Sequence, residues 1–337
     1  MRFKVHIHPG DRDFIVDPGE TLIDAAVRQG VPLPYGCRNG QCGACKGKIL
    51  EGRVDYGDFS PHALSEQEIN AGMALFCKAK PLTDIAIEPR SGHASQDVVV
   101  KKLPCRVEKM ELLSPEVMRL HLKLPNTERL QYAAGQYINI ILRDGRRRSF
   151  SIANPPHEPG FIELHIGLVE GGEFTGHVFN GMKEKDILRI EGPLGDFTLR
   201  KESVRPIILM AAGTGFAPIK GIVEDALTQG VHRPLYLYRG ASTKQDLYLD
   251  RIVRGWVSEV ENLEYAPVLS RPEADDSWRG RRGYVQDAVA GDFSDLSAFE
   301  VYASGSPAMV NAARETCLAR GLPREHFYFD AFEFGER

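Results

Sequence analysis

Four cysteines constrain what this 337-residue chain can fold into more than any other feature. Three are spaced as Cys37-x4-Cys42-x2-Cys45, and Cys77 follows after 31 intervening residues. This is the ligand spacing of one class of [2Fe–2S] site, and soft thiolates suit iron–sulfur clusters. Zinc or unrelated buried cysteines are the alternatives, but structural zinc usually takes paired C-x2-C units and only one such pair occurs here. The spacing therefore predicts a loop wrapped around a [2Fe–2S] cluster.

Composition narrows the class of protein. The formal net charge is −4, and 42% of residues are hydrophobic, so the chain lacks the basic excess typical of nucleic-acid binding. The N-terminus has no apolar core of signal-peptide length, and the longest apolar stretch, residues 207–219, is too short to span a bilayer. We expect a cytoplasmic protein with no membrane insertion and no nucleic-acid partner. The remaining cysteines, Cys105 and Cys317, are expected to be small buried hydrophobes.

The chain divides into segments of different pattern. Residues 1–90 hold short alternating runs, one helix signal and the cysteine loop, and the polar residues 91–102 are typical of a linker. Residues 103–200 are a series of short β-type runs separated by Gly, Pro and Asp-Gly, which predicts a small antiparallel barrel. In residues 203–337 apolar strand runs alternate with helical runs, which predicts a parallel α/β sheet.

Individual elements can be placed within these segments. The helix in the first segment is expected to begin at Thr21 and end by Gly30. The strands expected in the barrel are 117–124, 137–142, 149–153, 161–168 and 187–191. In the last segment we expect strands at 206–210, 235–238 and 300–303, and helices ending at 227 and covering 307–320.

Two motifs in the barrel segment could bind a flavin. Residues 148–151 read Arg-Ser-Phe-Ser on a strand; a guanidinium can clamp a phosphate, an aromatic can pack on the flavin ring, and a hydroxyl can hydrogen-bond its edge. Residues 171–176 supply a glycine turn into a short helix, where free N–H groups could hold a pyrophosphate. Taken singly, an exposed strand arginine and a capped tight turn are the better explanations of these two motifs.

Two glycine turns in the last segment could bind a dinucleotide. Residues 212–218, Ala-Gly-Thr-Gly-Phe-Ala-Pro, follow an apolar strand and precede a helix, where backbone amides can cradle a phosphate. They do not form the G-x-G-x-x-G fingerprint. Residues 302–309 place a second glycine turn between a strand and a helix, consistent with a second loop that lines the same crevice.

The order of these motifs, with Gly-Pro-Leu-Gly-Asp-Phe at 192–197 between them, resembles the ferredoxin–NADP reductase superfamily over residues 103–337. Residues 1–90 resemble a plant-type ferredoxin domain. The resemblance implies a multidomain α+β and α/β protein: a β-grasp [2Fe–2S] ferredoxin domain, an antiparallel β-barrel flavin domain and a parallel α/β nucleotide-binding domain.

The resemblance also implies roles for matching residues. Those implied to bind FAD, rather than FMN, are Arg148, Ser149, Phe150, Ser151, Gly172, Phe174 and Thr175. Those implied to bind the nicotinamide dinucleotide are Gly213, Thr214, Gly215, Pro218, Arg239, Gly305 and Met309. The residues implied to lie beside the reacting atoms are Ser151, Ser304 and Phe332, although a core position suits Phe332 equally well.

Two departures from the resembled pattern bear on the nicotinamide donor. Ser304 stands where many relatives have cysteine, and Ser242 stands where they often have an arginine. Without that guanidinium the grip on the 2′-phosphate of NADP is weaker. We therefore expect NADH as the donor, with NADPH kept open by Arg239 and Lys244.

Together these implications describe a reductase that takes hydride from NAD(P)H onto FAD and passes single electrons through its cluster to a partner protein. The domain order, ferredoxin first, resembles the reductases of benzoate, phenol and methane oxygenases. It also resembles reductases that serve CDP-6-deoxy-4-hexulose-3-dehydrase in 3,6-dideoxyhexose synthesis, to which the stretches 148–155, 161–166, 171–179 and 330–334 look closest. The partner is expected to be such a dehydrase, alternatively an aromatic or alkane oxygenase component, and the reductase itself a monomer. Rival hypotheses are a free flavin reductase or NADH oxidase, and a redox sensor, for which no output module is visible.

Overall fold

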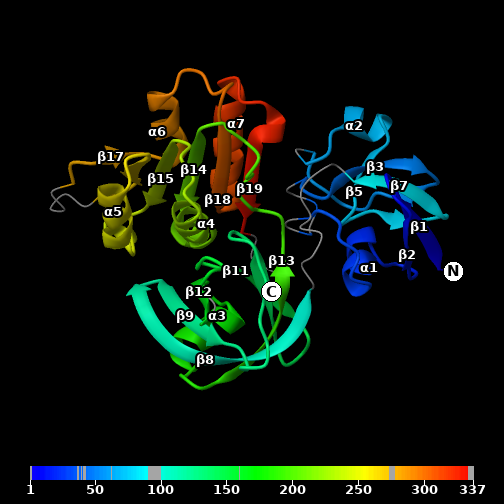
Figure 1. Cartoon of the computed structure of the whole chain (residues 1–337), viewed down its shortest axis with the longest axis horizontal. Coiled ribbons are helices and arrows are strands. Elements are labelled where there is room, and N and C mark those ends of the chain that lie inside the picture. The colour runs from blue at the N-terminus through cyan, green and yellow to red at the C-terminus, as the bar shows by residue number, and fades with distance from the viewer. Residues whose placement is uncertain are drawn as a thin grey trace. The chain divides into compact units, whose positions relative to one another are not determined.

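The computed structural model describes residues 2–35, 38, 40, 43–61, 63–89, 100–158, 160–272 and 278–332 (Figure 1). The chain divides into two compact units, one of residues 1–100 with 193–196 and the other of 101–192 with 197–337. Of the predicted linker 91–102, residues 91–99 lie outside the described part of the chain, while Lys101 and Lys102 already belong to a strand.

The first unit is built on a five-stranded mixed sheet in the order β2-β1-β7-β3-β5, with β1 and β7 parallel. Helix α1 begins where predicted, because the Thr21 side chain accepts a hydrogen bond from the Asp24 N–H and caps its first turn. These features confirm the predicted β-grasp domain. Its elements are β1 (Phe3–Ile7), β2 (Arg12–Val16), α1 (Leu22–Arg28), β3 (Lys46–Glu51), β4 (Val54–Asp55), α2 (Glu66–Asn70), β5 (Met73–Leu75), β6 (Lys80–Pro81) and β7 (Ile85–Pro89).

The second unit begins with a six-stranded antiparallel sheet in the order β11-β10-β13-β8-β9-β12. A bridge between Ile152 and Leu164 joins the chain after β11 to β12, so the two edges of the sheet meet and close the predicted barrel. Its elements are β8 (Lys101–Ser114), β9 (Val117–Lys123), β10 (Tyr137–Ile141), β11 (Arg147–Ser151), β12 (Ile162–Gly167), α3 (Glu173–Asn180) and β13 (Ile187–Leu194).

The rest of the second unit is a parallel six-stranded sheet in the order β17-β16-β15-β14-β18-β19. Along β14, Ile207 and Leu209 enter a core shared with α4 and α5, whereas Ile208 and Met210 enter a core shared with α6 and α7. Burial on both faces explains why β14 is a continuous apolar run. The elements are β14 (Ile207–Ala212), the 3₁₀ turn η1 (Gly213–Gly215), α4 (Phe216–Thr228), β15 (Leu235–Ala241), α5 (Asp250–Glu259), β16 (Leu263–Leu269), β17 (Arg281–Arg282), α6 (Val285–Asp292), β18 (Glu300–Gly305), α7 (Pro307–Ala319), η2 (Arg324–His326) and β19 (Phe327–Ala331).

The strand order creates the position where a ligand can bind. Strand β14 lies between β15 and β18, so the connections after β14 and β18 leave the sheet side by side at its carboxyl edge. Open α/β sheets bind ligands at such a switch point. Both predicted glycine turns, at Gly213 and Gly305, lie there.

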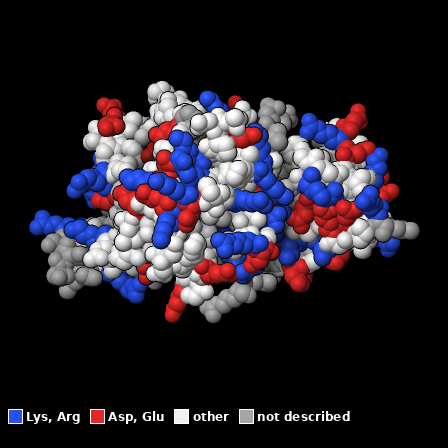
Figure 2. Space-filling view, turned by 90° about the horizontal axis from the view of Figure 1, so that it is seen from below, with Lys and Arg blue, Asp and Glu red and all other residues white. Residues whose placement is uncertain are grey.

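Positive and negative side chains both occur, in small groups, across the face that Figure 2 presents. This mixture agrees with the nearly balanced numbers of basic and acidic residues, 42 and 46. Among the described residues, no helix combines the length and apolarity that crossing a membrane requires.

Candidate functional site

Two of the four predicted cluster ligands lie together in the first unit. Cys45 and Cys77 are both buried, and the Cys77 N–H donates to Cys45 Sγ at 3.4 Å. Backbone N–H groups aimed at ligand sulfurs help to set the potential of an iron–sulfur site. Cys37 and Cys42 lie outside the described residues. Gly43 has a φ of +73°, a conformation that glycine adopts without cost, so the loop can turn beside Cys45. The described half of the donor set fits a thiolate-bound cluster.

The remaining cysteines are chemically different. Cys105 belongs to the barrel core and Cys317 to the core between the sheet and α7. Burial raises the pKa of each thiol to about 12. Both therefore stay protonated near neutral pH and pack as small apolar groups, as the sequence predicts.

Arg148 is distinguished from the two arginines before it. Arg146 pairs with Asp144 and Glu173, and Arg147 pairs with Glu191. Arg148 is half-buried, donates to the Arg147 carbonyl at 3.0 Å and forms no ion pair with a described residue. Of the three consecutive guanidinium groups, this one keeps its charge available for a phosphate.

Aromatic residues follow the same face of the barrel. Phe150, two positions along β11 from Arg148, is half-buried, and its ring centre lies 5.5 Å from that of the buried Phe174 in α3. Phe174 thus packs against the Phe150 ring, and Phe150 keeps an accessible part on which a flavin ring could pack.

The predicted pyrophosphate turn uses its hydroxyl group internally. Thr175 Oγ1 accepts from the Val169 N–H at 3.2 Å and lies 3.4 Å from the Gly172 carbonyl. The side chain therefore shapes the turn, and the groups left for a phosphate are the backbone N–H groups of the first turn of α3, which have no partner within the helix. Ser149 Oγ is likewise engaged, since it donates to Asn139 at 2.8 Å.

The glycines of η1 serve two different purposes. Gly213 has a φ of +54°, and a Cβ built on it would meet nothing within 4 Å. A Cβ on Gly215 would lie 2.1 Å from the Ser304 carbonyl oxygen. Gly213 thus faces open space, whereas Gly215 is needed so that the two glycine turns can touch.

Ser304 occupies the meeting point of the two turns. It is fully buried, and its Oγ has no hydrogen-bond partner among the described residues. An orphaned buried hydroxyl beside an open loop fits a site whose polar partner comes from a ligand. Next to it, the Phe332 N–H donates to the Gly305 carbonyl at 2.9 Å, which brings the C-terminal segment to this edge.

Pro218 and Met309 contribute through the helices rather than through polar groups. Pro218 is buried in the first turn of α4. The Met309 N–H donates to Ser306 Oγ at 3.3 Å and so belongs to the cap of α7. Both positions shape the start of the helix that follows a glycine turn.

Arg239 does not lie where a 2′-phosphate grip would need it. It is 1% exposed, and its guanidinium lies 3.8 Å from the ring centre of Phe216 and 4.6 Å from that of Tyr248. Neither terminal nitrogen has a hydrogen-bond partner among the residues that the structure describes, and burial lowers the pKa of the guanidinium. Arg271 instead places a guanidinium beside Ser242, since its Nη2 donates to Ser242 Oγ at 3.2 Å. No local pattern in the sequence singles out Arg271, because it follows a different strand from Ser242.

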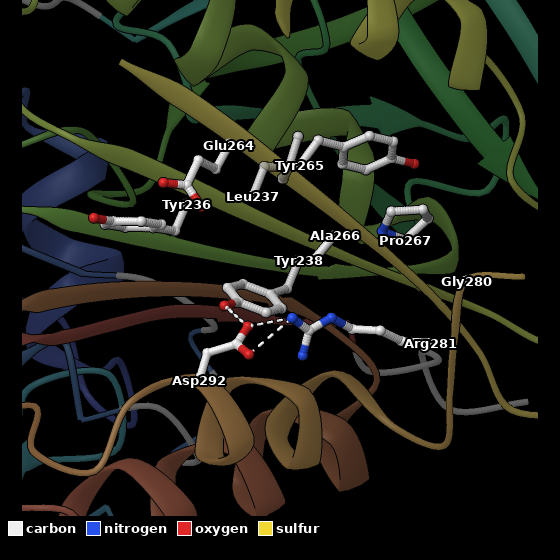
Figure 3. A pocket seen from close by; sticks show the side chains of 10 residues that line it. All are labelled: Tyr236, Leu237, Tyr238, Glu264, Tyr265, Ala266, Pro267, Gly280, Arg281 and Asp292. Atoms are coloured by element: carbon white, nitrogen blue, oxygen red, sulfur yellow. Dashed lines mark hydrogen bonds and ion pairs between the residues drawn. The ribbon is translucent and has the colours of Figure 1, made fainter. Parts of the chain in front are cut away.

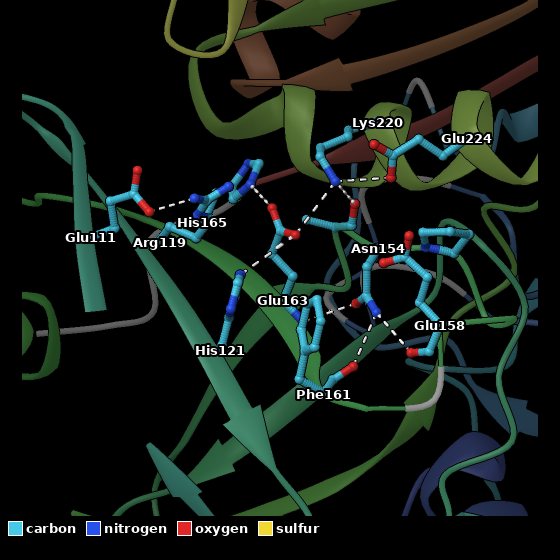
Figure 4. Close-up of polar contacts among 12 residues, drawn as sticks. Glu111, Arg119, His121, Asn154, Glu158, Phe161, Glu163, His165, Lys220 and Glu224 are labelled. Atoms are coloured by element: carbon cyan, nitrogen blue, oxygen red, sulfur yellow. Dashed lines mark hydrogen bonds and ion pairs between the residues drawn. The ribbon is translucent and has the colours of Figure 1, made fainter. Parts of the chain in front are cut away.

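A buried polar network joins the barrel to the α/β sheet (Figure 4). Glu163 on β12 lies 2.8 Å from His165 Nε2 and 3.4 Å from Lys220 Nζ. Lys220 on α4 also donates to the Ala153 carbonyl at 3.2 Å and to Glu224 at 2.8 Å. Sequence patterns gave no signal for this network, since its members come from elements far apart in the chain.

A pocket of about 260 Å³ lies elsewhere on the sheet (Figure 3). Three of its polar side chains pair with one another: the Tyr238 hydroxyl donates to the Asp292 carboxylate, and Arg281 lies 2.8 Å from that carboxylate. Among the described residues that line it there is none of those predicted for flavin or nicotinamide. The chemistry is therefore assigned to the carboxyl edge of the sheet and not to this pocket.

Comparison with known families gives three consecutive matches. Residues 5–82 match the 2Fe-2S iron-sulfur cluster binding domain, 104–199 the oxidoreductase FAD-binding domain and 209–315 the oxidoreductase NAD-binding domain. Together they cover most of the chain in the predicted order.

Individual relatives match over nearly the whole length. A CDP-6-deoxy-L-threo-D-glycero-4-hexulose-3-dehydrase reductase from Yersinia pestis is 38% identical over 98% of this chain and 99% of its own. The terephthalate 1,2-dioxygenase reductase component 1 from Comamonas is 35% identical over 98% of both chains. Among solved structures, the cytochrome P450 reductase GcoB from Amycolatopsis superposes with a TM-score of 0.83 at 31% identity, over 98% of both chains.

Proposed function

The chain belongs to the family of iron–sulfur flavoprotein reductases, and we propose that its partner is the 3-dehydrase of a CDP-linked 6-deoxy-4-hexulose. Reductases of this family pass electrons from NAD(P)H through FAD and a [2Fe–2S] cluster to a partner protein. The single observation that carries this proposal is the match to the Yersinia pestis dehydrase reductase, which extends over 98% of this chain. The alternative partner is an oxygenase component, which the Comamonas relative favours.

The residues present fit each group. Cys37, Cys42, Cys45 and Cys77 would hold the cluster. When bound, the flavin takes up two electrons with a hydride and releases them one at a time, which suits a one-electron cluster. Arg148 would hold a flavin phosphate through its uncommitted charge.

Phe150 and Ser151 would contact the flavin ring. Phe150 would cover its face, since its ring is supported by Phe174. Ser151 would lie beside its reacting edge, with the hydroxyl proton directed to Asp330. Phe332, tied to Gly305, would shield the nicotinamide side of the site from water.

The nicotinamide dinucleotide would bind across the two glycine turns. The backbone of Gly213 to Gly215 would cradle its pyrophosphate, and Ser304 would offer its unpaired hydroxyl to the nicotinamide end. We propose NADH as the preferred donor, because Ser242 lacks the guanidinium that the resembled pattern often has there and Arg239 is buried. Arg271 leaves a weaker route for NADPH.

We also propose the domain limits 1–90, 103–200 and 203–337, and a monomer that acts in the cytoplasm. The three family matches fall within these limits. Size-exclusion chromatography with light scattering would test the monomer, since a dimer would elute with twice the 37.5 kDa mass.

The internal electron path is tested by anaerobic NADH titration of the purified holoenzyme, followed by absorbance and low-temperature electron paramagnetic resonance. We expect flavin bleaching together with a rhombic [2Fe–2S] signal. Cys77→Ser should lose that signal and still bleach, whereas Cys105→Ser should behave as wild type. Bleaching with no cluster signal in the wild type would point instead to a free flavin reductase.

The partner is tested by supplying the reductase and NADH to purified CDP-6-deoxy-4-hexulose-3-dehydrase, with the terephthalate oxygenase component in a parallel assay. We expect substrate turnover with the dehydrase only. Turnover with the oxygenase only would favour the alternative, and Cys77→Ser should abolish whichever turnover is seen.

A further inference from the structure

The network around Glu163 has a fixed distribution of protons. Burial alone would raise the pKa of Glu163, but its hydrogen bond with His165 and the charge of Lys220 outweigh burial and lower the pKa to about 2. Glu163 is therefore a carboxylate near neutral pH, and a carboxylate only accepts hydrogen bonds. His165 Nε2, which lies 2.8 Å from Glu163 Oε1, must then carry a hydrogen.

His165 consequently accepts at its other nitrogen. The ring is completely buried, and burial lowers its pKa, although Glu163 opposes this shift and the charges of Lys220 and Arg239 reinforce it. The imidazole is thus neutral near pH 7 and carries a single N–H, which is on Nε2. Nδ1 has no hydrogen and can only accept, and the Tyr248 hydroxyl oxygen lies 3.2 Å away.

The Tyr248 hydroxyl has one proton and two acceptors at nearly equal distances, so the proton is shared between them in a three-centre hydrogen bond. His165 Nδ1 lies at 3.2 Å and the Gly213 carbonyl oxygen at 3.3 Å. The ring cannot swing away, because it packs edge-on against Phe216 and the Arg239 guanidinium covers it. The Tyr248 hydroxyl therefore contacts both His165 on β12 and Gly213, the first residue of η1.

The Gly213 carbonyl determines how the loop presents its backbone. It accepts from Tyr248 and also from the Phe216 N–H, which closes the 3₁₀ turn. Because a peptide unit is planar, fixing this carbonyl fixes the direction of the Thr214 N–H in the same unit. Gly213 by itself would allow that plane to rotate, since its φ is positive and its surroundings are open.

We propose that Tyr248 is a positioning residue for the dinucleotide: oriented by His165, it fixes the Gly213–Thr214 peptide plane so that the Thr214 N–H points at the bound pyrophosphate. The inference rests on the proposed role of residues 213–215. The inference adds a connection from strand β12 to the loop of residues 213–215. The Ala153 carbonyl, which follows β11, and this loop then belong to one polar network.

The test is Tyr248→Phe in the holoenzyme, which removes the hydroxyl and keeps the ring. We expect the Kd for NAD+, measured by calorimetry on the oxidised enzyme, and the KM for NADH to rise about three- to tenfold, the value of one net hydrogen bond. The kcat should stay within about twofold, and the FAD content and cluster signal should not change. Tyr238→Phe is the matched control, because both tyrosines are 3% exposed but the Tyr238 hydroxyl bonds to Asp292.

His165 is tested by a double-mutant cycle. His165→Asn removes the acceptor that shares the Tyr248 proton, so the Kd for NAD+ should change in the otherwise wild-type enzyme and hardly at all in the Tyr248→Phe background, because the two residues act through one contact. An unchanged Kd in Tyr248→Phe, an equal rise in Tyr238→Phe, or independent effects in the cycle would each overturn the inference. A wild type that neither binds NAD+ nor is bleached by NADH would instead overturn the proposed function itself.

Discussion

Ser151 Oγ donates a 2.9 Å hydrogen bond to Asp330 Oδ2, which joins the flavin strand β11 to the C-terminal strand β19. A hydroxyl whose proton is engaged in this way turns its lone pairs elsewhere. Ser151 can therefore accept a hydrogen bond from a group placed beside it, because Asp330 already takes the hydrogen of its hydroxyl group.

Ser151→Ala should slow the bleaching of FAD by NADH about tenfold, because a hydrogen bond supported by a charged partner is lost at the reacting edge. FAD content should remain that of the wild type. Anaerobic stopped-flow absorbance measures the rate, and Ser114→Ala, another buried serine of the barrel, is the control. If FAD is bleached at the same rate in both variants, Ser151 has no role in hydride transfer.

The two glycines of η1 should respond differently to alanine. Gly215→Ala should destabilise the fold severely, because its Cβ would collide with the Ser304 carbonyl. Gly213→Ala should lose only about 1 kcal/mol for its positive φ, and yet bind NAD+ more weakly. Gly230→Ala, also at positive φ with open surroundings, gives the backbone cost alone. Thermal unfolding and calorimetry separate the two effects, and wild-type affinity in Gly213→Ala would contradict a ligand at this loop.

Arg271 should matter for NADPH and hardly for NADH. Its guanidinium is exposed beside Ser242, where it could meet a 2′-phosphate. Arg271→Ala is expected to lower kcat/KM for NADPH about tenfold and for NADH less than twofold, as measured in parallel steady-state assays. Arg282→Ala, an exposed arginine on β17, should change neither. A parallel loss with both donors would mean that Arg271 supports the fold.

Lys220→Met should lower the free energy of unfolding by about 3–5 kcal/mol, because it leaves the buried Glu163 carboxylate without its cation. The double variant Glu163→Gln with Lys220→Met should recover part of this loss. Urea unfolding at pH 7 provides the comparison. A single variant as stable as wild type would show that water reaches the network.

Acid should weaken the same network over a defined range. The pKa of Glu163 is lowered from 4.5 to about 2 and that of His165 is lowered from 6.5, so the unfolded chain binds more protons in acid. Stability should fall as pH drops through 6.5, where unfolded histidine becomes charged, and again from about 4.5 towards 2. Urea unfolding measures the free energy of unfolding across this range. In Glu163→Gln this free energy should fall less steeply between about pH 4.5 and 2 than in the wild type.

The sequence predicted those elements whose signals are local. Thr21 caps α1 as expected, and the apolar run at 206–210 is the core of β14, because capping and burial are written in neighbouring residues. Strand β8 was missed as an element, since Pro104 and alternating charges obscure its inward residues; Pro104 nevertheless sits in register with Arg189.

The site was predictable only to the level of its motifs. Arg148 could be named, but its selection over Arg146 and Arg147 depends on where Glu173 and Glu191 lie in space. The buried position of Arg239 likewise depends on the rings stacked upon it. Charges and hydroxyls that pair across separate elements leave no periodic trace in a sequence, which is why the Glu163 network was not foreseen.

The four cysteines proposed as cluster ligands all belong to residues 1–100, while the residues proposed for flavin and nicotinamide belong to 101–337. This separation has an evolutionary consequence. Substitutions in the first hundred residues could change the electron acceptor of such a protein without altering the residues proposed to act in hydride transfer. The same hydride-accepting unit could thereby serve reductases with different electron acceptors.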